Sequence, residues 1–452
     1  MTSLRRPAFA GLVRRRRATT RPRAPLPAGF GAIWSTVALD LVGFGIILPL
    51  LPQYAERFGA SPAVVGALFA SFSVAQLVCA PLWGAVSDRV GRRPVLLLSL
   101  VGTALGSLLT GLAGSLPLLF AGRLVDGASG ASVSVAHAAV ADLAAPEERA
   151  RLFGFLGAAF GLGFVAGPAL GALATLGGTR LPFFVAAALA AANAVVASRR
   201  LPETHGRDVD HVSGPRGAAR MPADAVVGLD GGSPLEGEAL LGMATEAHAD
   251  AAPPAGLEGP AGTEGTEGTE GGSAGLGRLV AVAFGSLVAF SAFEATFALF
   301  GERRLSFEPA STGAVFTAIG LVLALVQSSL VRPAVRRLGE SRTLRLALLA
   351  NAAGLAVLAA VHSWWLLAPA LLLLVVGQGL ATPSLTSAVA GRASARRRGG
   401  ALGVQQSAGG LARVVGPVAG GLAFQHVGVP APYLGGAVVM VLCAAAVAVP
   451  RR

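Results

Sequence analysis

The stretch that decides the fold is residues 84–94, GAVSDRVGRRP, a short charged segment between two long apolar runs. The run before it covers 63–84, and the run after it covers 95–114. About 20 apolar residues in helical conformation cross the hydrocarbon core of a bilayer. The pattern therefore predicts two membrane-spanning helices joined by a tight loop, in which the glycines allow the turn.

The same alternation continues in both directions along the chain. Further apolar runs lie at 30–52, 117–140, 153–175, 181–198, 279–300, 311–331, 343–361, 364–389, 400–423 and 430–449. Hydrophobic residues make up 53% of the 452 residues and charged residues only 13%, whereas a soluble domain usually carries about 25% charged residues. We expect an all-α integral membrane protein with twelve transmembrane helices in two six-helix bundles.

The arginines predict the orientation. The loops after every second helix are rich in arginine and include Arg89, Arg92, Arg93, Arg199, Arg200, Arg332, Arg336, Arg337, Arg342, Arg392 and Arg396 to Arg398. This positive-inside asymmetry predicts a bacterial inner-membrane protein with both termini in the cytoplasm. It also accounts for the net charge of +12 without a nucleic-acid partner.

Composition divides the chain into four segments. We expect an Arg-rich cytoplasmic N-terminus at 1–28, a first bundle at 29–200, a linker at 201–277 and a second bundle at 278–452. The linker contains the Gly-Thr-Glu triplets of 262–270 and too few apolar residues to form a core, which predicts a disordered cytoplasmic tether. No nucleotide loop, nucleophile elbow or metal-ligand spacing is present, so neither an enzyme, a metal nor a cofactor is expected.

Three motifs carry a resemblance to a known family. Residues 84–93 fit Gly-x-x-x-Asp-Arg-x-Gly-Arg-Arg, and residues 163–171 (GFVAGPALG) and 410–421 (GLARVVGPVAGG) repeat one Gly-Pro pattern in the two halves. These motifs resemble the major facilitator superfamily, within it the twelve-helix drug–proton antiporters, and most of all their tetracycline-efflux branch. The resemblance implies a conformational latch at Gly84, Asp88, Arg89, Gly91, Arg92 and Arg93. It also implies tight helix packing at Gly163, Gly167, Pro168, Gly171, Gly416 and Pro417.

Charges kept inside the membrane are the candidates for proton coupling. An ionisable group at the bilayer centre costs about 2.5–3.5 kcal/mol, so it needs a reason. Asp40 lies roughly 16 Å into its helix by the rise per residue, and we expect it to bind and release the coupling proton with Arg123 as its partner. A permanent packing pair is the alternative, and Asp126 is the alternative partner of Arg123. Glu294 is expected in the outer vestibule, where it attracts a cationic substrate, carries a second proton or snorkels to the interface.

The substrate-pocket candidates are Phe44, Asp126, Phe290, Phe297, Gln327 and Gln378. Lipid-facing phenylalanines and helix-to-helix contacts of the glutamines are the alternatives. The tetracycline branch carries an acid where this chain has Gly106 and a histidine where it has Leu323. A metal–tetracycline site is therefore incomplete, and a different amphiphilic substrate is expected.

The resemblance implies a proton-coupled secondary transporter that exports small drug-like or metabolite compounds by alternating access. Such an antiporter would contribute to multidrug efflux and antibiotic resistance, with the proton gradient as its energy source. We expect a monomer in the lipid bilayer whose partners are protons and a small-molecule substrate. Two alternatives remain: a proton symporter or uniporter for a metabolite, and a non-transporting membrane sensor built on the same scaffold.

Overall fold

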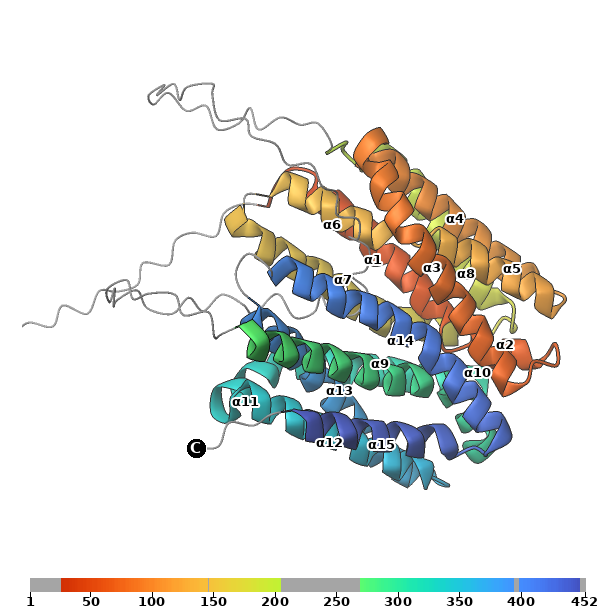
Figure 1. The fold of residues 1–452 in the computed structure, drawn as a ribbon. Helices are drawn as coiled ribbons and strands as arrows, with labels where there is room; N and C mark the ends of the chain where they lie inside the picture. Colours follow the sequence, from red (N-terminus) through yellow and green to blue (C-terminus); the bar gives the residue numbers. More distant parts are fainter. Residues whose placement is uncertain (1–25, 145, 205–268, 394–397, 448–452) are drawn as a thin grey trace, which may run out of the picture.

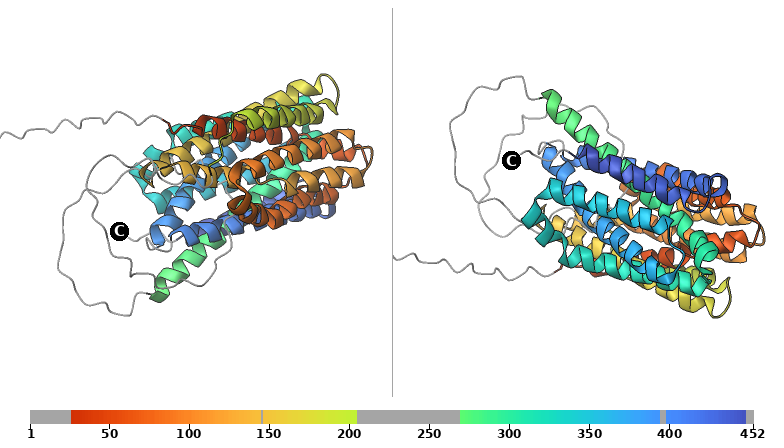
Figure 2. Two further views of the ribbon diagram at one scale, coloured as in Figure 1. Left: turned by 90° about the horizontal axis from the view of Figure 1, so that it is seen from above. Right: turned by 90° about the horizontal axis from the view of Figure 1, so that it is seen from below.

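The computed structural model describes residues 26–144, 146–204, 269–393 and 398–447. All elements in these ranges are α-helices, which run side by side along a common axis (Figure 1). Almost all of the expected N-terminal segment and most of the expected linker lie outside the described residues. Figure 2 shows the two halves from opposite sides, with the first half in front in one view and the second half in front in the other.

The first half contains eight helical segments that make six passes. They are α1 (Phe30–Ile47), α2 (Leu51–Glu56), α3 (Pro62–Val90), α4 (Arg92–Leu112), α5 (Leu116–Ala128), α6 (Ser132–Leu143), α7 (Pro146–Thr175) and α8 (Leu181–Arg200). Two expected spans are each divided into two helices. The first breaks near Pro49, which has no amide hydrogen to donate, and the fourth breaks between α5 and α6.

The second half makes six passes with seven segments. They are α9 (Thr269–Leu305), α10 (Pro309–Ser329), α11 (Val331–Leu338), α12 (Glu340–Ala359), α13 (Trp364–Arg392), α14 (Arg398–His426) and α15 (Ala431–Ala446). Nine of the described helices are each long and apolar enough to cross a membrane. Helix α14, the shorter apolar helix α15 and the α5–α6 pair complete the twelve passes. Helices suit this environment because their backbone hydrogen bonds are satisfied internally.

The two halves repeat one backbone feature at equivalent loops. Gly91, between α3 and α4, has φ 101° and ψ 160°, and Gly339, between α11 and α12, has φ 78° and ψ 160°. Positive φ at such a position favours glycine because a side chain would be strained there. Each glycine directly precedes a helix that begins with the next residue. The shared conformation supports a common origin of the two loops, although Arg336 stands three residues before Gly339 where Asp88 stands three before Gly91.

The Gly-Pro motifs hold helices at backbone distance. A Cβ built on Gly167 of α7 would lie 2.6 Å from Cα of Gly45 in α1, and one built on Gly416 of α14 would lie 2.6 Å from the carbonyl oxygen of Val288 in α9. Only glycine allows such close approach. The two motif helices therefore pack in the same way on the first helix of their own half.

The same two helices also contact the opposite half. A Cβ on Gly313 of α10 would lie 2.9 Å from the carbonyl oxygen of Pro168, and one on Gly66 of α3 would lie 2.2 Å from that of Pro417. Here α7 meets α10, and α14 meets α3, along surfaces made largely of backbone. We call this paired contact the seam between the halves.

The seam is closed by polar contacts at one end of the bundle. We call this end of the bundle the far end. The opposite end, at which α8 ends and α9 begins, is called the linker end. Three contacts cross between the halves there: Gln53 Nε2 donates to the Phe307 carbonyl at 3.1 Å, the Ala63 amide donates to Gln425 Oε1 at 3.2 Å, and Arg303 Nη2 lies 3.5 Å from Glu56 Oε1. Burial, followed by the negative charge of Glu302, raises the pKa of Glu56 to about 7. The far end is thus sealed by contacts that include a titratable group.

Candidate functional site

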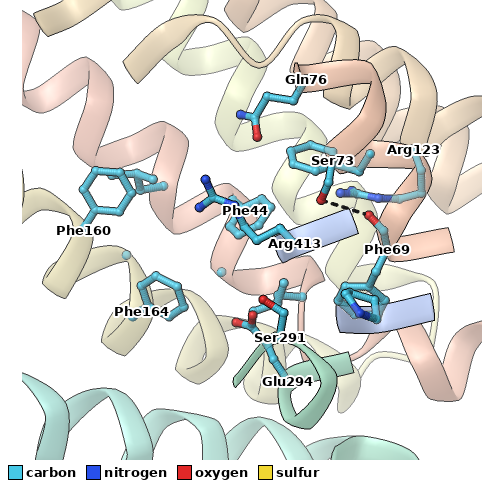
Figure 3. A pocket seen from close by; sticks show the side chains of 16 residues that line it. Phe44, Phe69, Ser73, Gln76, Arg123, Phe160, Phe164, Ser291, Glu294 and Arg413 are labelled. Carbon is cyan, nitrogen blue, oxygen red and sulfur yellow. Dashed lines mark hydrogen bonds between the residues drawn. The ribbon is translucent and has the colours of Figure 1, made fainter. Parts of the chain in front are cut away.

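A central cavity lies between the two halves (Figure 3); its empty volume, which includes space open to solvent, is about 770 Å³. Helices α1, α3, α5 and α7 contribute to it from one half, and α9 and α14 contribute from the other. Five phenylalanines form most of its apolar lining: Phe44, Phe69, Phe72, Phe160 and Phe164. Four charged or amide side chains join them: Gln76, Arg123, Glu294 and Arg413. A concave apolar site with a few polar groups is the usual form of a small-molecule site.

Arg123 forms its ion pair with Asp126 rather than with Asp40. The Nη1 atom of Arg123 lies 2.8 Å from Oδ2 of Asp126, and the two residues are only 4% and 5% exposed. The guanidinium also lies 4.4 Å from the centre of the Phe72 ring, a distance typical of a cation–π contact. Of the two partners that the sequence left open, the structure selects the one that follows Arg123 by three positions on the same helix.

Asp40 is held by a hydroxyl instead of an arginine. Ser132 Oγ donates to Asp40 Oδ2, while Asp40 Oδ1 is buried with no hydrogen-bond partner in the described part of the chain. Ser132 is the first residue of α6, so the break between α5 and α6 brings this hydroxyl to α1. The carboxyl group of Asp40 therefore keeps one oxygen available.

A smaller cavity connects Asp40 with the ion pair. Its polar lining consists of Asp40, Gln76, Thr103, Ser107, Asp126 and Ser132. It shares Leu41, Phe44, Phe72 and Gln76 with the central cavity. The proton candidate thus lies behind the aromatic wall of the central cavity, within the first half.

Glu294 lines the central cavity itself, together with Ser291 from the same helix. Glu294 therefore lies in the cavity between the halves and not in an outer vestibule, because α9 continues beyond it to Leu305 before reaching the far end. Arg413 of α14 acts electrostatically on Glu294. Figure 3 shows Arg413 reaching into the middle of the cavity while Glu294 approaches from α9.

The remaining pocket candidates are divided between cavity and core. Phe44 lines both cavities, and Asp126 lines the smaller one. Phe297 is fully buried among Phe293, Phe300, Phe307 and Phe316, with ring centroids 5.1 to 6.1 Å away, so it belongs to the core of the second half. Phe290 packs on Phe293 at 5.8 Å at the edge of that cluster.

The two glutamine candidates differ in their surroundings. Gln378 lines a third cavity and accepts a hydrogen bond from Asn351 Nδ2 at 2.9 Å. Gln327 is half-buried on α10 and does not line any of the three cavities described here. Only Gln378 therefore has the placement that a pocket residue requires.

The loop motif forms a polar cluster at the linker end. Arg92 donates to Asp142 Oδ2 at 3.0 Å and to Ser87 Oγ at 2.7 Å, and it pairs with Asp88. It thereby ties the end of α3 to the end of α6. The carboxylate of Glu203 accepts from the backbone amides of Arg92 and Arg93 at 2.9 and 3.2 Å. An acid at a helix N-terminus satisfies amides that have no partner within the helix.

Three of these functional groups were not predicted. Arg413 is a charge inside an expected span, so the rule that marks Asp40 applies to it equally, although its position within a packing motif conceals it. Glu203 lies where the polar linker was expected to begin, and Ser132 is an ordinary serine in an apolar run. Nothing in the local sequence distinguishes either of them.

Comparison with known proteins identifies the family. A family model described as Major Facilitator Superfamily matches residues 33–333 and 279–452. The class G tetracycline resistance protein of Vibrio anguillarum is 33% identical over 388 residues, which cover 84% of this chain and 86% of that protein. The human Major facilitator superfamily domain-containing protein 10 is 32% identical over 409 residues, which cover 84% of each.

Solved structures agree with the fold. The crystal structure of the human organic anion transporter MFSD10 (TETRAN) is 28% identical with a TM-score of 0.61, covering 93% of this chain and 99% of that one. The nucleoside transporter NupG is 14% identical with a TM-score of 0.63, covering 92% and 97%, and shows the fold alone. This chain therefore belongs to the Major Facilitator Superfamily, as a twelve-helix transporter similar to the tetracycline resistance proteins.

Proposed function

We propose that this protein is a proton-coupled antiporter that exports amphiphilic drug-like or metabolite compounds by alternating access. The protein would reside in a bacterial inner membrane, with its Arg-rich linker end facing the cytoplasm. The similarity to tetracycline resistance proteins supports export of a drug-like cargo. Gly106 and Leu323 stand where the tetracycline branch carries an acid and a histidine, which favours a cargo other than a metal–tetracycline complex.

The observation that carries the proposal is the free carboxyl oxygen of Asp40. With a single hydroxyl partner, Asp40 can take up and release a proton without breaking an ion pair. The neighbouring Arg123 and Asp126 neutralise each other's charge in their ion pair. Intramembrane ionisable groups of this kind mark proton pathways in transporters. In the proposal, Asp40 is the proton carrier and Arg123 organises the site around Asp126.

The central cavity is the proposed cargo site. Its phenylalanines offer flat apolar surfaces, while Glu294 and Arg413 offer one charge of each sign. Because the smaller cavity shares Phe44, Phe72 and Gln76 with it, a cargo in the central cavity and a proton on Asp40 act on the same side chains. This shared lining is the proposed physical basis of coupling.

The sealed far end supports a state that is open toward the linker end. With the linker end in the cytoplasm, the cavity would accept cargo from inside the cell. Opening of the far end then requires the seam contacts at Gln53, Glu56 and Ala63 to separate. The latch cluster around Arg92 would stabilise one of the two states, as the loop motif implies.

The test uses everted membrane vesicles from cells that lack their own drug exporters. Wild type and Asp40→Asn are compared for proton-driven uptake of ethidium, tetracycline and rhodamine B, with a protonophore added in parallel. The matched control is Glu148→Gln, the same kind of change at a half-buried acid of α7. We expect uptake that the protonophore abolishes in wild type and control, and loss of at least about tenfold in Asp40→Asn.

The outcomes separate the alternatives. Full proton-driven transport by a well-folded Asp40→Asn variant would refute the role of Asp40. Cargo movement in the same direction as protons would indicate a symporter. If the protein is present in the membrane but transports no compound of a broad panel, a non-transporting membrane sensor becomes the better proposal.

A further inference from the structure

The break between α5 and α6 leaves backbone carbonyl groups that no longer have partners in their own helix. Helix α5 ends at Ala128 and α6 begins at Ser132, so the ladder of helical hydrogen bonds is interrupted between them. Inside a membrane-spanning bundle no bulk water satisfies such carbonyls, and an unsatisfied one is costly. Side chains of neighbouring helices therefore have to supply the donors.

Three consecutive carbonyls at this break each accept a hydrogen bond from a side chain of α3 or α4. Trp83 Nε1 donates to the Ala128 carbonyl at 2.6 Å, Ser99 Oγ donates to that of Ser129, and Gln76 Nε2 donates to that of Gly130 at 3.1 Å. Trp83 and Ser99 line none of the three cavities described above, whereas Gln76 lines both the central and the smaller cavity. Of the three donors, Gln76 is the one through which a molecule in the central cavity can act on the break.

The chemistry of the Gly130 carbonyl fixes the orientation of the Gln76 amide. A carbonyl oxygen can only accept, so the amide nitrogen of Gln76 faces it and the amide oxygen is turned away from it. Figure 3 shows the amide group directed from α3 toward the interior of the central cavity. An amide oxygen accepts hydrogen bonds from N–H and O–H groups. Gln76 is therefore suited to a donor group on the cargo.

The other side of the break leads to the proton candidate. Ser132 follows Gly130 by two positions, and its Oγ atom donates to Asp40 Oδ2. In the described lining of the smaller cavity, to which α7 and α8 contribute no residue, the only other titratable group is Asp126, which is paired with Arg123. A hydrogen bond from a hydroxyl to a carboxylate is charge-assisted and loses much of its strength when the carboxyl group is protonated. The position of the break and the proton on Asp40 therefore influence each other.

We propose that Gln76 is a positioning residue that couples binding of the cargo to the proton on Asp40. A donor group of the cargo binds the amide oxygen of Gln76 and holds its nitrogen on the Gly130 carbonyl, which keeps Ser132 at the Asp40 carboxylate. Binding of the cargo thereby favours release of the proton from Asp40 to water, and by reciprocity protonation of Asp40 favours release of the cargo. This inference rests on the proposed antiport and adds the residue that links its two sites and the donor-bearing class of cargo that this residue detects.

The test counts the protons that are released when cargo binds, independently of transport. Ethidium, which carries aromatic amino groups, is added to the purified protein in lipid nanodiscs in weakly buffered medium; pyranine reports the protons and ethidium fluorescence reports binding. We expect wild type to release protons in proportion to the ethidium bound, and Asp40→Asn to release about fivefold fewer or none. A wild type that releases no protons, or full release by Asp40→Asn, refutes the proposed antiport through Asp40 and this inference with it.

Gln76→Met removes the amide group at nearly unchanged side-chain length. It should bind ethidium at most about tenfold more weakly, as the loss of one neutral hydrogen bond provides. At saturating ethidium it should release about fivefold fewer protons per dye bound than wild type. Gln327→Met is the matched control at a half-buried glutamine of α10 that lines none of the three cavities, and it should release as many protons as wild type. Undiminished release by Gln76→Met, while Asp40→Asn releases none, refutes the role of Gln76 and leaves the antiport standing.

Gly130→Ala provides a second route if Gln76→Met does not fold. Its Cβ would lie 2.9 Å from Gln76 Nε2, which is the end of a flexible side chain and can be displaced. The substitution therefore removes the contact between Gln76 and the break while keeping the amide group, and it should lower the protons released per ethidium by about fivefold. Undiminished release by a monodisperse Gly130→Ala protein overturns the proposal.

The cargo side of the contact is tested by removing the donor groups from the dye. The deaminated analogue of ethidium shares its aromatic cation but lacks the amino groups. We expect wild type to bind this analogue more weakly or to release about fivefold fewer protons per analogue bound than per ethidium. Equal affinity and equal proton release with the two dyes contradict the contact between the cargo and Gln76.

Discussion

Substitution of Gly167 by alanine measures how far the fold depends on backbone contact at the Gly-Pro motif. The added Cβ would lie 2.6 Å from Gly45 Cα, 2.7 Å from Gly45 C and 2.8 Å from the Val42 carbonyl oxygen. Ordinary van der Waals contact begins at 3.4 Å, so the shortest of these falls short by about 0.8 Å. All three atoms are backbone of α1, which means that the helix as a whole must move.

The expected cost of this clash is about 1–3 kcal/mol, the usual range for overpacking. It is offset by about 1 kcal/mol, because alanine is a better helix former than glycine. Gly161 lies on the same helix as Gly167, and a Cβ built on it would meet no atom of another helix within 4 Å. Gly161→Ala therefore isolates the gain in helix propensity. The difference between the two variants therefore gives the clash alone.

The measurement is the free energy of unfolding of wild type, Gly167→Ala and Gly161→Ala by titration with SDS in mixed micelles. We expect Gly161→Ala to equal or exceed wild type, and Gly167→Ala to be less stable than Gly161→Ala by about 1–3 kcal/mol. Equal stability of the two variants would show that α1 and α7 do not pack through bare backbone at the Gly-Pro motif.

Three further predictions concern the far end, the ion pair and the loop cluster. Glu56 has a pKa of about 7 in the sealed state, against an ordinary value of 4.5 once it is exposed. The sealed state therefore binds the proton more tightly, and lowering the pH favours the sealed state. Distances between spin labels across the far end should shorten as pH falls through about 7, and Glu56→Gln should remove that dependence; a wild type indifferent to pH contradicts this. Gly106→Asp should not restore a tetracycline site but should reduce folded yield, because its Cβ would lie 2.7 Å from the Asp126 backbone nitrogen; normal yield on size-exclusion chromatography would disprove it. Glu203→Gln should lower the free energy of unfolding by about 1–3 kcal/mol, since the backbone amides of Arg92 and Arg93 lose a charged acceptor. An unchanged free energy of unfolding would show that the Glu203 carboxylate does not stabilise the start of α4.

Sequence periodicity and charge predicted the architecture because each span is decided locally. An apolar run of sufficient length forms a membrane helix whatever its neighbours are. The same logic located Asp40, Arg123 and Asp126 as internal charges. The Arg123–Asp126 pairing was also within reach, since residues three apart share a helix face.

The rest of the site depends on contacts between distant segments. Ser132 reaches Asp40 across 92 positions, and only because α6 begins anew after a break that apolar composition conceals. The core position of Phe297 follows from which helix faces α9, which periodicity alone does not specify. Glu203 reaches Arg92 across 111 positions, from a segment whose composition predicts no structure.

The seam has a mechanical consequence. Where α7 meets α10 and α14 meets α3, a glycine of one half lies against the carbonyl oxygen of Pro168 or Pro417 in the other. At a glycine no side-chain rotamer has to rearrange when the two helices move past each other. A movement between the halves that opens the far end then has to break the contacts of Gln53, Ala63 and Arg303 there. The carboxyl group of Glu56 therefore sets part of the cost of that movement.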